Sequence, residues 1–167
     1  MARTELDRTV QQPLLDRLID LDPKAGAEAP MTLAQSVRAL KASVRRDLEW
    51  LLNTRRIPEA VPEELEELSQ SLYSYGLPDI SSMSRDAIES RIKLLRHVER
   101  TIAQFEPRLA RVRVSMVEDD GGEGARRELR FVIEAILRMD PNPEQVVFDT
   151  VLEITSGEYQ VSGGAGA

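Results

Sequence analysis

The chain has 167 residues, of which 41% are hydrophobic and 31% are charged, and its formal net charge is −7 at pH 7. These values are typical of one soluble domain with a modest core. The negative charge gives no general attraction to phosphate backbones, and the 4% aromatic content leaves few rings to stack on bases. The lack of cysteine excludes disulfides and thiolate metal sites. We therefore expect no nucleic-acid partner, no cofactor and no metal.

The N-terminal residues predict a helix and a linker ahead of the main domain. The start, MARTELDRTVQQ, lacks the apolar region of a signal peptide, and no stretch reaches the roughly 18 apolar residues of a membrane span. Leucines four apart after Pro13 predict a short amphipathic helix over residues 13–20. The composition of residues 22–30, DPKAGAEAP, is typical of a mobile linker. We expect an N-terminal helix and flexible linker (1–31), one α+β domain (32–161) and a disordered tail (162–167).

Three further helices are predicted before Pro107. Thr32 and Gln35 match a capping box that opens a long helix, which we expect to end at Asn53-Thr54. A shorter acidic helix is expected to begin at Pro62 and to end near Gly76 in a left-handed cap. A third helix is expected to start from a cap at Ser82 or Ser84. The apolar stripe of the long helix is Leu33, Val37, Leu40, Val44, Leu48, Leu51 and Leu52, and that of the third is Ile88, Ile92, Leu95, Val98, Ile102 and Phe105.

After Pro107 the hydrophobic period changes from 3.6 to 2, which predicts strands. The connections between them are too short for crossover helices, so neighbouring strands should be antiparallel. The predicted fold class is α+β, with N-terminal helices packed on one face of a small, mainly antiparallel sheet of three to four strands. The expected inward series are Ala110, Val112, Val114 and Met116; Leu129, Phe131, Ile133, Ala135 and Leu137; and Val146, Phe148, Leu152 and Ile154. A short fourth strand is expected over residues 158–161.

Catalytic chemistry finds little support in the residue pattern. His97 is the only histidine, and its place between the stripe positions of a helix predicts an ordinary surface or boundary residue. Glu106 could act as an acid beside Pro107, with a second carboxylate from Asp79, Glu118, Asp119 or Asp149. Nothing in the spacing selects one of these, and pairing with arginines is the simpler interpretation. We therefore nominate no catalytic residue.

The long helix and its end carry six cations against two acids over residues 33–56. The next segment supplies five glutamates within residues 59–67, so we expect a solvated face or internal pairing between the two. A protein partner is the second interpretation, and nucleic acid is the least favoured. Trp50 is expected in the core or at its boundary.

The edges of the predicted sheet suggest a binding function instead of catalysis. An open sheet presents unpaired N–H and C=O groups at its two outer strands. Arg111, Arg113 and Arg130 would either blunt such edges or leave one free to pair with a strand of another chain. The sequence leaves both possibilities open.

Five stretches, taken in order, carry a family resemblance over about residues 13–161. They are PLLDRLID (13–20), SVRALKASVRRDLEWLLNTRR (36–56), YGLPDISSMS (75–84), FEPRLARVRV (105–114) and VVFDTVLEI (146–154). In this order they resemble the baseplate wedge family of contractile injection machines. That family includes the TssE subunits of type VI secretion baseplates and the lysozyme-like wedge proteins of contractile-tailed phages.

The resemblance implies a non-enzymatic, structural protein of a cytoplasmic baseplate on the inner face of the inner membrane. Glu106, Pro107 and Arg108 match the Glu-Pro-Arg element through which the family docks on the wedge proteins TssF and TssG. Asn53 and Arg55, from the LLNTR stretch, complete the expected partner-binding residues. TssK is a further expected baseplate partner. The sheet is expected to template polymerisation of the sheath proteins TssB and TssC.

The Glu-Pro-Arg element also has a physical interpretation of its own. Pro107 has a fixed φ, so the backbone holds the directions of Glu106 and Arg108. Fixed charges lower the ordering cost of docking on a partner, and a guanidinium forks onto carboxylates as lysine cannot. An intramolecular staple between Glu106 and a nearby arginine is the alternative. Two other functions stay open: a lysozyme-like peptidoglycan hydrolase, and a soluble regulatory adaptor that binds one protein.

Overall fold

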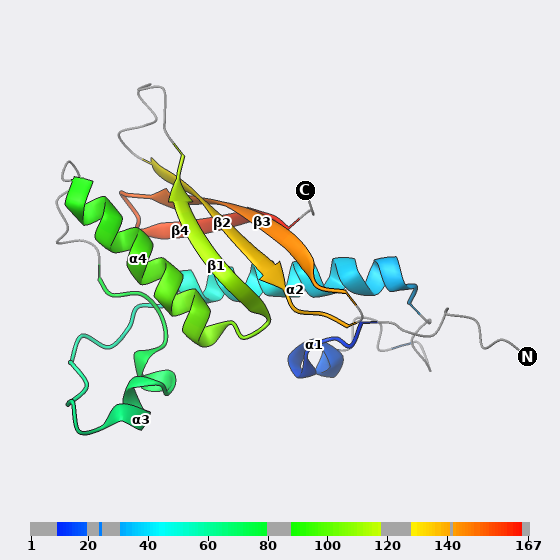
Figure 1. Cartoon of the computed structure of the whole chain (residues 1–167), viewed down its shortest axis with the longest axis horizontal. Coiled ribbons are helices and arrows are strands. Elements are labelled where there is room, and N and C mark those ends of the chain that lie inside the picture. Colours follow the sequence, from blue (N-terminus) through cyan, green and yellow to red (C-terminus); the bar gives the residue numbers. More distant parts are fainter. Residues whose placement is uncertain are drawn as a thin grey trace, which may run out of the picture.

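The computed structural model describes residues 10–19, 24, 31–79, 88–117, 128–140 and 142–164. Figure 1 shows α2 running across the strands and α4 lying beside β1. The elements in chain order are α1 (Leu14–Leu18), α2 (Leu33–Asn53), α3 (Glu66–Ser69), the 3₁₀ helix η2 (Leu72–Ser74), α4 (Ile88–Phe105), β1 (Leu109–Met116), β2 (Glu128–Leu137), β3 (Glu144–Glu153) and β4 (Glu158–Gly163). The predicted linker except Lys24, the cap at Ser82 or Ser84, the connection over 118–124 and the tail residues 165–167 lie outside the described residues.

The four strands form one antiparallel sheet in the order β1-β2-β3-β4. Every neighbour in the sheet is also a neighbour in sequence, as the short connections predict. The predicted α+β class, with N-terminal helices on a C-terminal antiparallel sheet, is therefore confirmed. Within the described part of the chain, no helix combines the length and the apolar character needed to cross a bilayer.

Helix α2 begins and ends where the sequence predicts. The Thr32 hydroxyl accepts from the Gln35 amide at 3.3 Å, and the Gln35 side chain accepts from the Thr32 amide at 2.8 Å, which completes the capping box. Leu33, in the first turn, is 47% exposed, so the apolar stripe starts later than expected. The buried side chains of α2 are Ser36, Leu40, Ser43, Val44, Leu48, Leu51 and Leu52.

Helix α4 uses a different row of side chains from the predicted stripe. Leu94, Val98 and Ile102 are buried, whereas Ile92 is 42% exposed. The predicted stripe included Ile92 and omitted Leu94, which was wrong for both. The reason is local: Leu94 and Leu95 are adjacent, so two rows compete, and contact with the sheet selects the i, i+4 row through Leu94.

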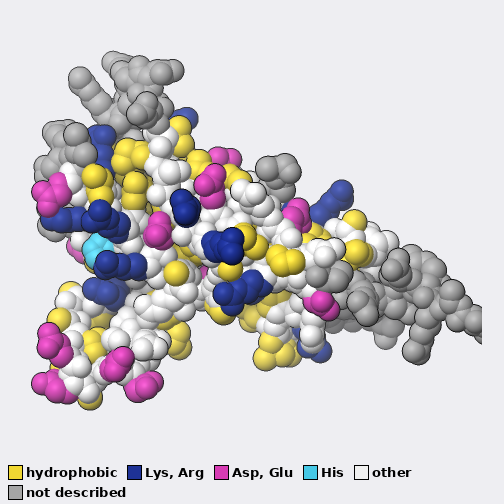
Figure 2. All heavy atoms as spheres, in the orientation of Figure 1, with side chains coloured by type: hydrophobic (Ala, Val, Ile, Leu, Met, Phe, Trp, Pro, Cys, Tyr) yellow, Lys and Arg dark blue, Asp and Glu magenta, His cyan; other side chains and the backbone are white. Residues whose placement is uncertain are grey.

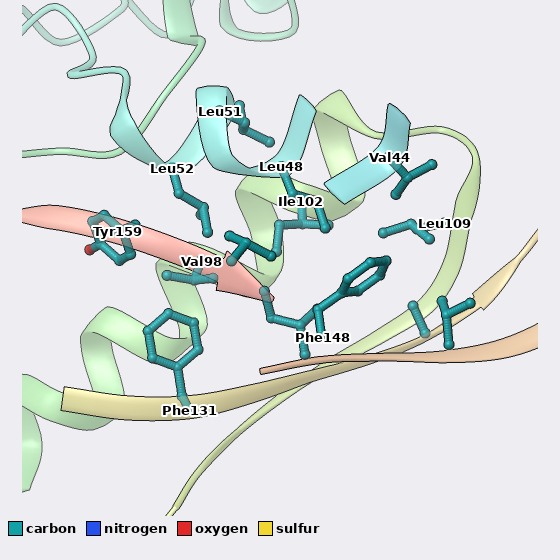
Figure 3. Close-up of a cluster of buried hydrophobic side chains, with 14 of the residues drawn as sticks. Val44, Leu48, Leu51, Leu52, Val98, Ile102, Leu109, Phe131, Phe148 and Tyr159 are labelled. Carbon is teal, nitrogen blue, oxygen red and sulfur yellow. The ribbon is translucent and has the colours of Figure 1, made fainter. Parts of the chain in front are cut away.

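One face of the sheet packs on α2 and α4. Alternating side chains of β2, β3 and β4 are buried there, and Figure 3 shows Phe131, Phe148 and Tyr159 facing Val98 and Leu48 across the core. Fully burying each large apolar side chain contributes about 1.5–3 kcal/mol relative to exposing it. This layer of two helices on a meander is the arrangement that the apolar stripes predict.

The opposite face of the sheet mixes aliphatic and charged side chains. Val132, Val147 and Val151 are half-buried there, beside the exposed Glu134 and Asp149. Figure 2 shows basic, acidic and hydrophobic side chains interspersed over the region of the strands. The alternation of β2 and β3 is therefore that of a sheet with one covered face.

Strand β1 contains a bulge that the sequence prediction missed. The register with β2 shifts between Ala110 and Arg113, and Arg111 has a φ of 53°. The extra residue brings Leu109 onto the same face as Val114, where both contact the core. Ala110 lies opposite Ile136 on the other face, so its predicted inward direction was wrong.

The expected acidic helix is shorter than predicted. Only Glu66–Ser69 and the 3₁₀ turn Leu72–Ser74 are helical. Gly76 does have a positive φ, of 97°, one residue past the cap of that turn. A Cβ at Gly76 would lie 2.2 Å from the Thr54 carbonyl oxygen, and the Leu77 amide donates to that oxygen at 2.9 Å. The YGLPD stretch therefore packs on the end of α2.

The last two strands differ slightly from their predicted bounds. Strand β3 ends at Glu153, and Thr150 takes a buried place in its inward series, whereas Ile154 lies in the following turn. Strand β4 runs to Gly163, two residues beyond the predicted end. The Gly164 amide donates to the Val147 carbonyl at 2.9 Å, so pairing with β3 continues past Val161.

Candidate protein-docking site

The Glu-Pro-Arg element forms the junction between α4 and β1. The Glu106 amide still donates to the Ile102 carbonyl at 2.9 Å, as the last helical bond. Pro107 has no N–H to continue the helix. The Arg108 carbonyl accepts from the Arg138 amide at 2.7 Å, which begins the pairing with the β2 side of the sheet. The junction is therefore tied to a helix on one side and to the sheet on the other.

Glu106 and Arg108 bind each other across this junction. The Arg108 Nε donates to Glu106 Oε1 at 2.6 Å, and Nη2 donates to Oε2. The Arg108 amide also donates to Oε1, at 3.2 Å. Glu106 is only 4% exposed. The intramolecular staple, which the sequence left as an alternative, is thus present in the isolated chain.

Arg108 also reaches the middle of α2. Its Nη2 donates to Asp47 Oδ2 at 2.6 Å, and its Nη1 donates to Ser43 Oγ at 3.2 Å. Burial by itself lowers the pKa of the Arg108 guanidinium, but its hydrogen bonds to Glu106 and Asp47 outweigh this and raise the pKa. Arg108 therefore stays charged and is held by three groups.

Arg46 and Asp16 close the network into a ring. Arg46 Nη1 donates to Asp16 Oδ1 at 2.5 Å, and Arg46 Nη2 donates to Asp47 Oδ1 at 2.8 Å. The Ser43 hydroxyl donates to Asp16 Oδ2 at 2.6 Å. We call this set the Arg108 cluster: Asp16, Ser43, Arg46, Asp47, Glu106 and Arg108. Its two guanidinium groups and three carboxylates have a formal charge of −1.

Tyr75, the first residue of the YGLPD stretch, lies near the cluster. Its ring packs edge-on against Phe105 with 5.3 Å between the centroids. Burial raises the pKa of Tyr75, and the negative charges of Asp47 and Glu106 raise it further. The first residue of YGLPD therefore lies within the field of the cluster.

Asn53 holds the outer strand of the sheet. Its Nδ2 donates to the Tyr159 carbonyl at 2.8 Å, and its Oδ1 accepts from the Tyr159 amide at 2.8 Å. The same Nδ2 donates to the Glu49 carbonyl at 2.9 Å. The amide group thus takes the place of a neighbouring strand at the edge of β4. The structure directs Asn53 into the fold, and its predicted contact with a partner stays a prediction.

Arg55 lies at the same end of α2 and is exposed. Its backbone forms an isolated parallel bridge with Leu77. Its guanidinium lies close to Gly157 in the turn between β3 and β4, 3.7 Å from the position of an added Cβ. The five predicted site residues therefore fall into two groups. The Glu-Pro-Arg element contacts the middle of α2 through Arg108, and Asn53 and Arg55 lie at the C-terminal end of that helix.

Helix side chains also bind the other edge of the sheet. Glu99 of α4 accepts from the Val114 amide of β1 at 3.2 Å. Arg111 and Arg113 are exposed on the same strand, and Arg113 lies opposite Glu134 in register. Both outer strands therefore have part of their backbone bound by a helix, which reduces the free length of each edge.

The cations of α2 do not pair as the sequence predicts. Lys41 binds Glu144 at 2.7 Å, and Arg46 binds Asp16 and Asp47. Within the described residues, no ion pair joins α2 to the glutamates of 59–67, because the acids that the fold places beside Lys41 and Arg46 come from other segments. Arg38 and Arg45 are exposed, so the solvated alternative holds for these two cations.

Two single residues had explicit predictions. Trp50 is 53% exposed, so its expected place in the core or at its boundary was wrong. The Arg46 guanidinium lies 4.9 Å from its ring centroid. His97 is an exposed residue of α4, as predicted. Partial burial and the nearby charges of Arg100 and Arg56 lower the pKa of His97.

A two-carboxylate catalytic site finds no support in the described residues. Both oxygens of Glu106 are bound by Arg108 on the helix-covered side of the sheet. Asp149 belongs to the opposite, exposed series of β3, and Glu118 and Asp119 lie outside the described residues. Glu106 therefore pairs with Arg108, and no second carboxylate of the candidate pair lies beside it in the described residues.

The sequence prediction does not include Asp16, Ser43, Arg46 or Asp47. One signal points to two of them: Ser43 and Asp47 are four residues apart on a helix and share a face. Nothing in the sequence places Asp16 beside Ser43, because 27 positions separate them.

The fold is that of a small α+β protein, and the Arg108 cluster is a part-buried network of charged side chains within it. The described residues contain no arrangement of catalytic groups. The family described as baseplate wedge protein gp25 matches residues 38–142, which is more than half of the chain. The chain belongs to this baseplate wedge family, and the resemblance found in the sequence is confirmed. No curated protein and no solved structure matches the chain. The matched range contains Asn53, Arg55 and the Glu-Pro-Arg element, but it excludes Asp16.

Proposed function

We propose that this protein is a structural subunit of the baseplate of a type VI secretion machine. It docks on the wedge proteins TssF and TssG through the Glu-Pro-Arg element, within a baseplate that also contains TssK. The assembly stands on the cytoplasmic face of the inner membrane. Membership of the baseplate wedge family supports the structural role, and the order of the five sequence stretches supports the type VI branch.

The observation that carries the docking proposal is the way Arg108 is held. Glu106 and Asp47 bind the guanidinium from two sides, while 22% of its side chain stays exposed. Among the described residues, Glu106, Asp47 and Ser43 use four of its five N–H groups, which leaves one for an acceptor on a partner. A side chain that is already ordered loses little entropy on docking.

The sheet is the proposed contact with the sheath proteins TssB and TssC. An antiparallel meander has two outer strands, and another chain can extend either one by backbone pairing. Asn53 and Glu99 bind part of each edge at Tyr159 and Val114. A sheath strand would therefore pair beside these points or replace one of the two helix side chains.

Arg108→Lys tests the docking proposal without removing the charge that Glu106 needs. Lysine cannot form the forked contact, so we expect a folded protein whose affinity for purified TssF and TssG falls at least tenfold. Thermal melting followed by circular dichroism checks the fold. Arg96→Lys, at an exposed position of α4, is the matched control and should bind as the wild type does. Wild-type binding by folded Arg108→Lys would contradict the proposal.

Two other functions are separated by simple assays. Turnover of purified peptidoglycan that disappears in Glu106→Gln would establish the lysozyme-like hydrolase instead. Capture of one soluble regulator, in place of baseplate and sheath proteins, would establish the adaptor. For the structural subunit we expect no turnover and co-purification with wedge proteins.

A further inference from the structure

Residues 10–19 lie along α2 and attach to it mainly through polar groups. The Val10 amide donates to Ser36 Oγ at 3.1 Å, and the Gln12 side chain donates to the Ser36 carbonyl at 2.8 Å. Val10 is buried, but α1 itself has no buried residue, and Leu14 and Leu18 are 69% and 73% exposed. The C-terminal half of this segment therefore buries no apolar side chain.

Asp16 makes the main contact of α1 with the domain. Its two oxygens take one donor each from side chains three residues apart on α2, Arg46 Nη1 at 2.5 Å and Ser43 Oγ at 2.6 Å. A guanidinium and a hydroxyl on one helical face form a binding site for a carboxylate. Burial alone would raise the pKa of Asp16, but the hydrogen bonds from Arg46 and Ser43 outweigh it and lower the pKa.

The charge of the Arg108 cluster depends on this contact. With Asp16 present, the cluster has three carboxylates and two guanidinium groups. Without it, the cluster is neutral, and both Arg46 Nη1 and the Ser43 hydroxyl lose the acceptor that they now share. Ser43 also accepts from Arg108 Nη1, so one hydroxyl connects the Asp16 contact directly to the Glu-Pro-Arg element.

We propose that Arg46 and Ser43 form a carboxylate-binding site that Asp16 occupies in the free chain and that an acidic side chain of the docking partner occupies in the assembly. Residues 10–19 then act as an intramolecular competitor beside Arg108. This inference rests on the proposed function only for the identity of the partner. Occupancy by Asp16 is a property of the chain alone.

The energetics favour exchange over permanent attachment. The Asp16 and Arg46 side chains are 19% and 29% exposed, and ion pairs that reach solvent are weak. A tethered ligand still has a high effective concentration, so it fills the site until a partner with further contacts arrives. A partner carboxylate gains the same two hydrogen bonds and adds its contact with Arg108.

Asp16→Asn tests occupancy in the free protein. An asparagine amide has one oxygen and no charge, and its NH2 group only donates, so it cannot accept both hydrogen bonds. We therefore expect α1 to detach and trypsin to cleave after Arg17 several times faster. Glu89→Gln, which removes an exposed acid on α4, is the matched control and should leave cleavage unchanged. The melting temperature of Asp16→Asn should stay within a few degrees of the wild type. Unchanged cleavage in Asp16→Asn would overturn the inference.

Affinity for purified TssF and TssG tests the exchange. We expect Asp16→Asn to bind threefold to tenfold more tightly, because the competitor is weakened, and Arg46→Gln to bind more weakly. Faster cleavage with unchanged affinity in both variants would overturn the exchange and leave the proposed function standing. If the wild type does not bind TssF and TssG, the proposed function is overturned, and so is the exchange of Asp16 for a partner carboxylate. The trypsin result still decides whether Asp16 occupies the site in the free chain.

Discussion

The middle and the C-terminal end of α2 make two polar contacts of different kinds. In the middle, Ser43, Arg46 and Asp47 bind charged groups that come from α1 and from the Glu-Pro-Arg element. At the end, Asn53 binds the backbone of β4 with a neutral amide. Salt and pH weaken ion pairs near the surface, whereas an amide bound to a strand responds to neither. We therefore expect the strength of the contact in the middle of α2 to depend on salt and pH, and that of the contact at its C-terminal end to be independent of both.

Arg108→Ala should break the charged contact with the largest effect. It leaves the buried Glu106 carboxylate without its guanidinium, and an uncompensated buried charge costs about 3 kcal/mol of unfolding free energy. Urea unfolding measures this loss. Arg96→Ala should change stability by less than about 0.5 kcal/mol. A loss below about 1 kcal/mol in Arg108→Ala would mean that the staple contributes little to the fold.

Asn53→Ala should break the neutral contact. The Tyr159 amide and carbonyl lose their partners at the edge of β4, so we expect a loss of about 2 kcal/mol and faster hydrogen exchange at the Tyr159 amide. The loss should be the same at low and high salt, unlike that of Arg108→Ala. Asn142→Ala, at an exposed position before β3, is the control. A strong salt dependence for Asn53→Ala would remove the distinction between the two contacts.

Thr150→Val extends the comparison to a buried hydroxyl that makes neither a charged nor a neutral polar contact with another described residue. The Thr150 hydroxyl oxygen is buried in β3 and has no hydrogen-bond partner among the described residues. Valine has nearly the same shape, so we expect a gain of about 1 kcal/mol in urea unfolding. Thr54→Val is the control and should lose stability, because the Thr54 hydroxyl donates to the Trp50 carbonyl at 2.7 Å. Destabilisation by Thr150→Val would indicate a bound partner for its hydroxyl.

Acid pH should release α1 with the smallest effect. The folded chain lowers the pKa of Asp16 below its ordinary value of 3.8, so this contribution is present above pH 3.8 and is lost as the pH falls through the lower, folded pKa. The pair contributes less than about 1 kcal/mol. Asp47, Glu106, Arg46 and Arg108 face the same site, and the two guanidinium groups stay charged in acid. Asp16→Asn isolates the part of the acid response that belongs to Asp16.

Trp50 fluorescence measures this release, because Arg46 binds Asp16 and also lies over the Trp50 ring. We expect a transition below pH 3.8 in the wild type that is absent in Asp16→Asn. Identical titrations of the two proteins would contradict the assignment to Asp16.

Much of the fold follows from local patterns. The capping box of Thr32 and Gln35, the end of α2 at Asn53 and the alternation of β2 are all confirmed, because each depends on residues close together in the chain. Predictions failed where two local solutions compete. Leu94 displaced Ile92 from the stripe of α4, and the bulge at Arg111 moved Ala110 to the other face of the sheet.

The candidate site was only half predictable. Glu106 and Arg108 follow from their charges around Pro107, but their partners do not. Arg108 meets Ser43 across 65 positions, and Asn53 meets Tyr159 across 106. No periodicity connects residues at such distances, since only the packing of α2 against the sheet brings them together.

By itself, the sequence determined the α+β class, the order of the elements, the rigid junction at Pro107 and the membership of a wedge family. Only the tertiary structure decided that Arg108 is bound by Glu106 and Asp47, that Asn53 replaces a strand beside β4 and that Asp16 fills a site on α2. The physical reason is the range of the interactions. Backbone preferences and hydrophobic periods act over a few residues, whereas a charge or an amide binds whatever group the fold places within about 3 Å of it.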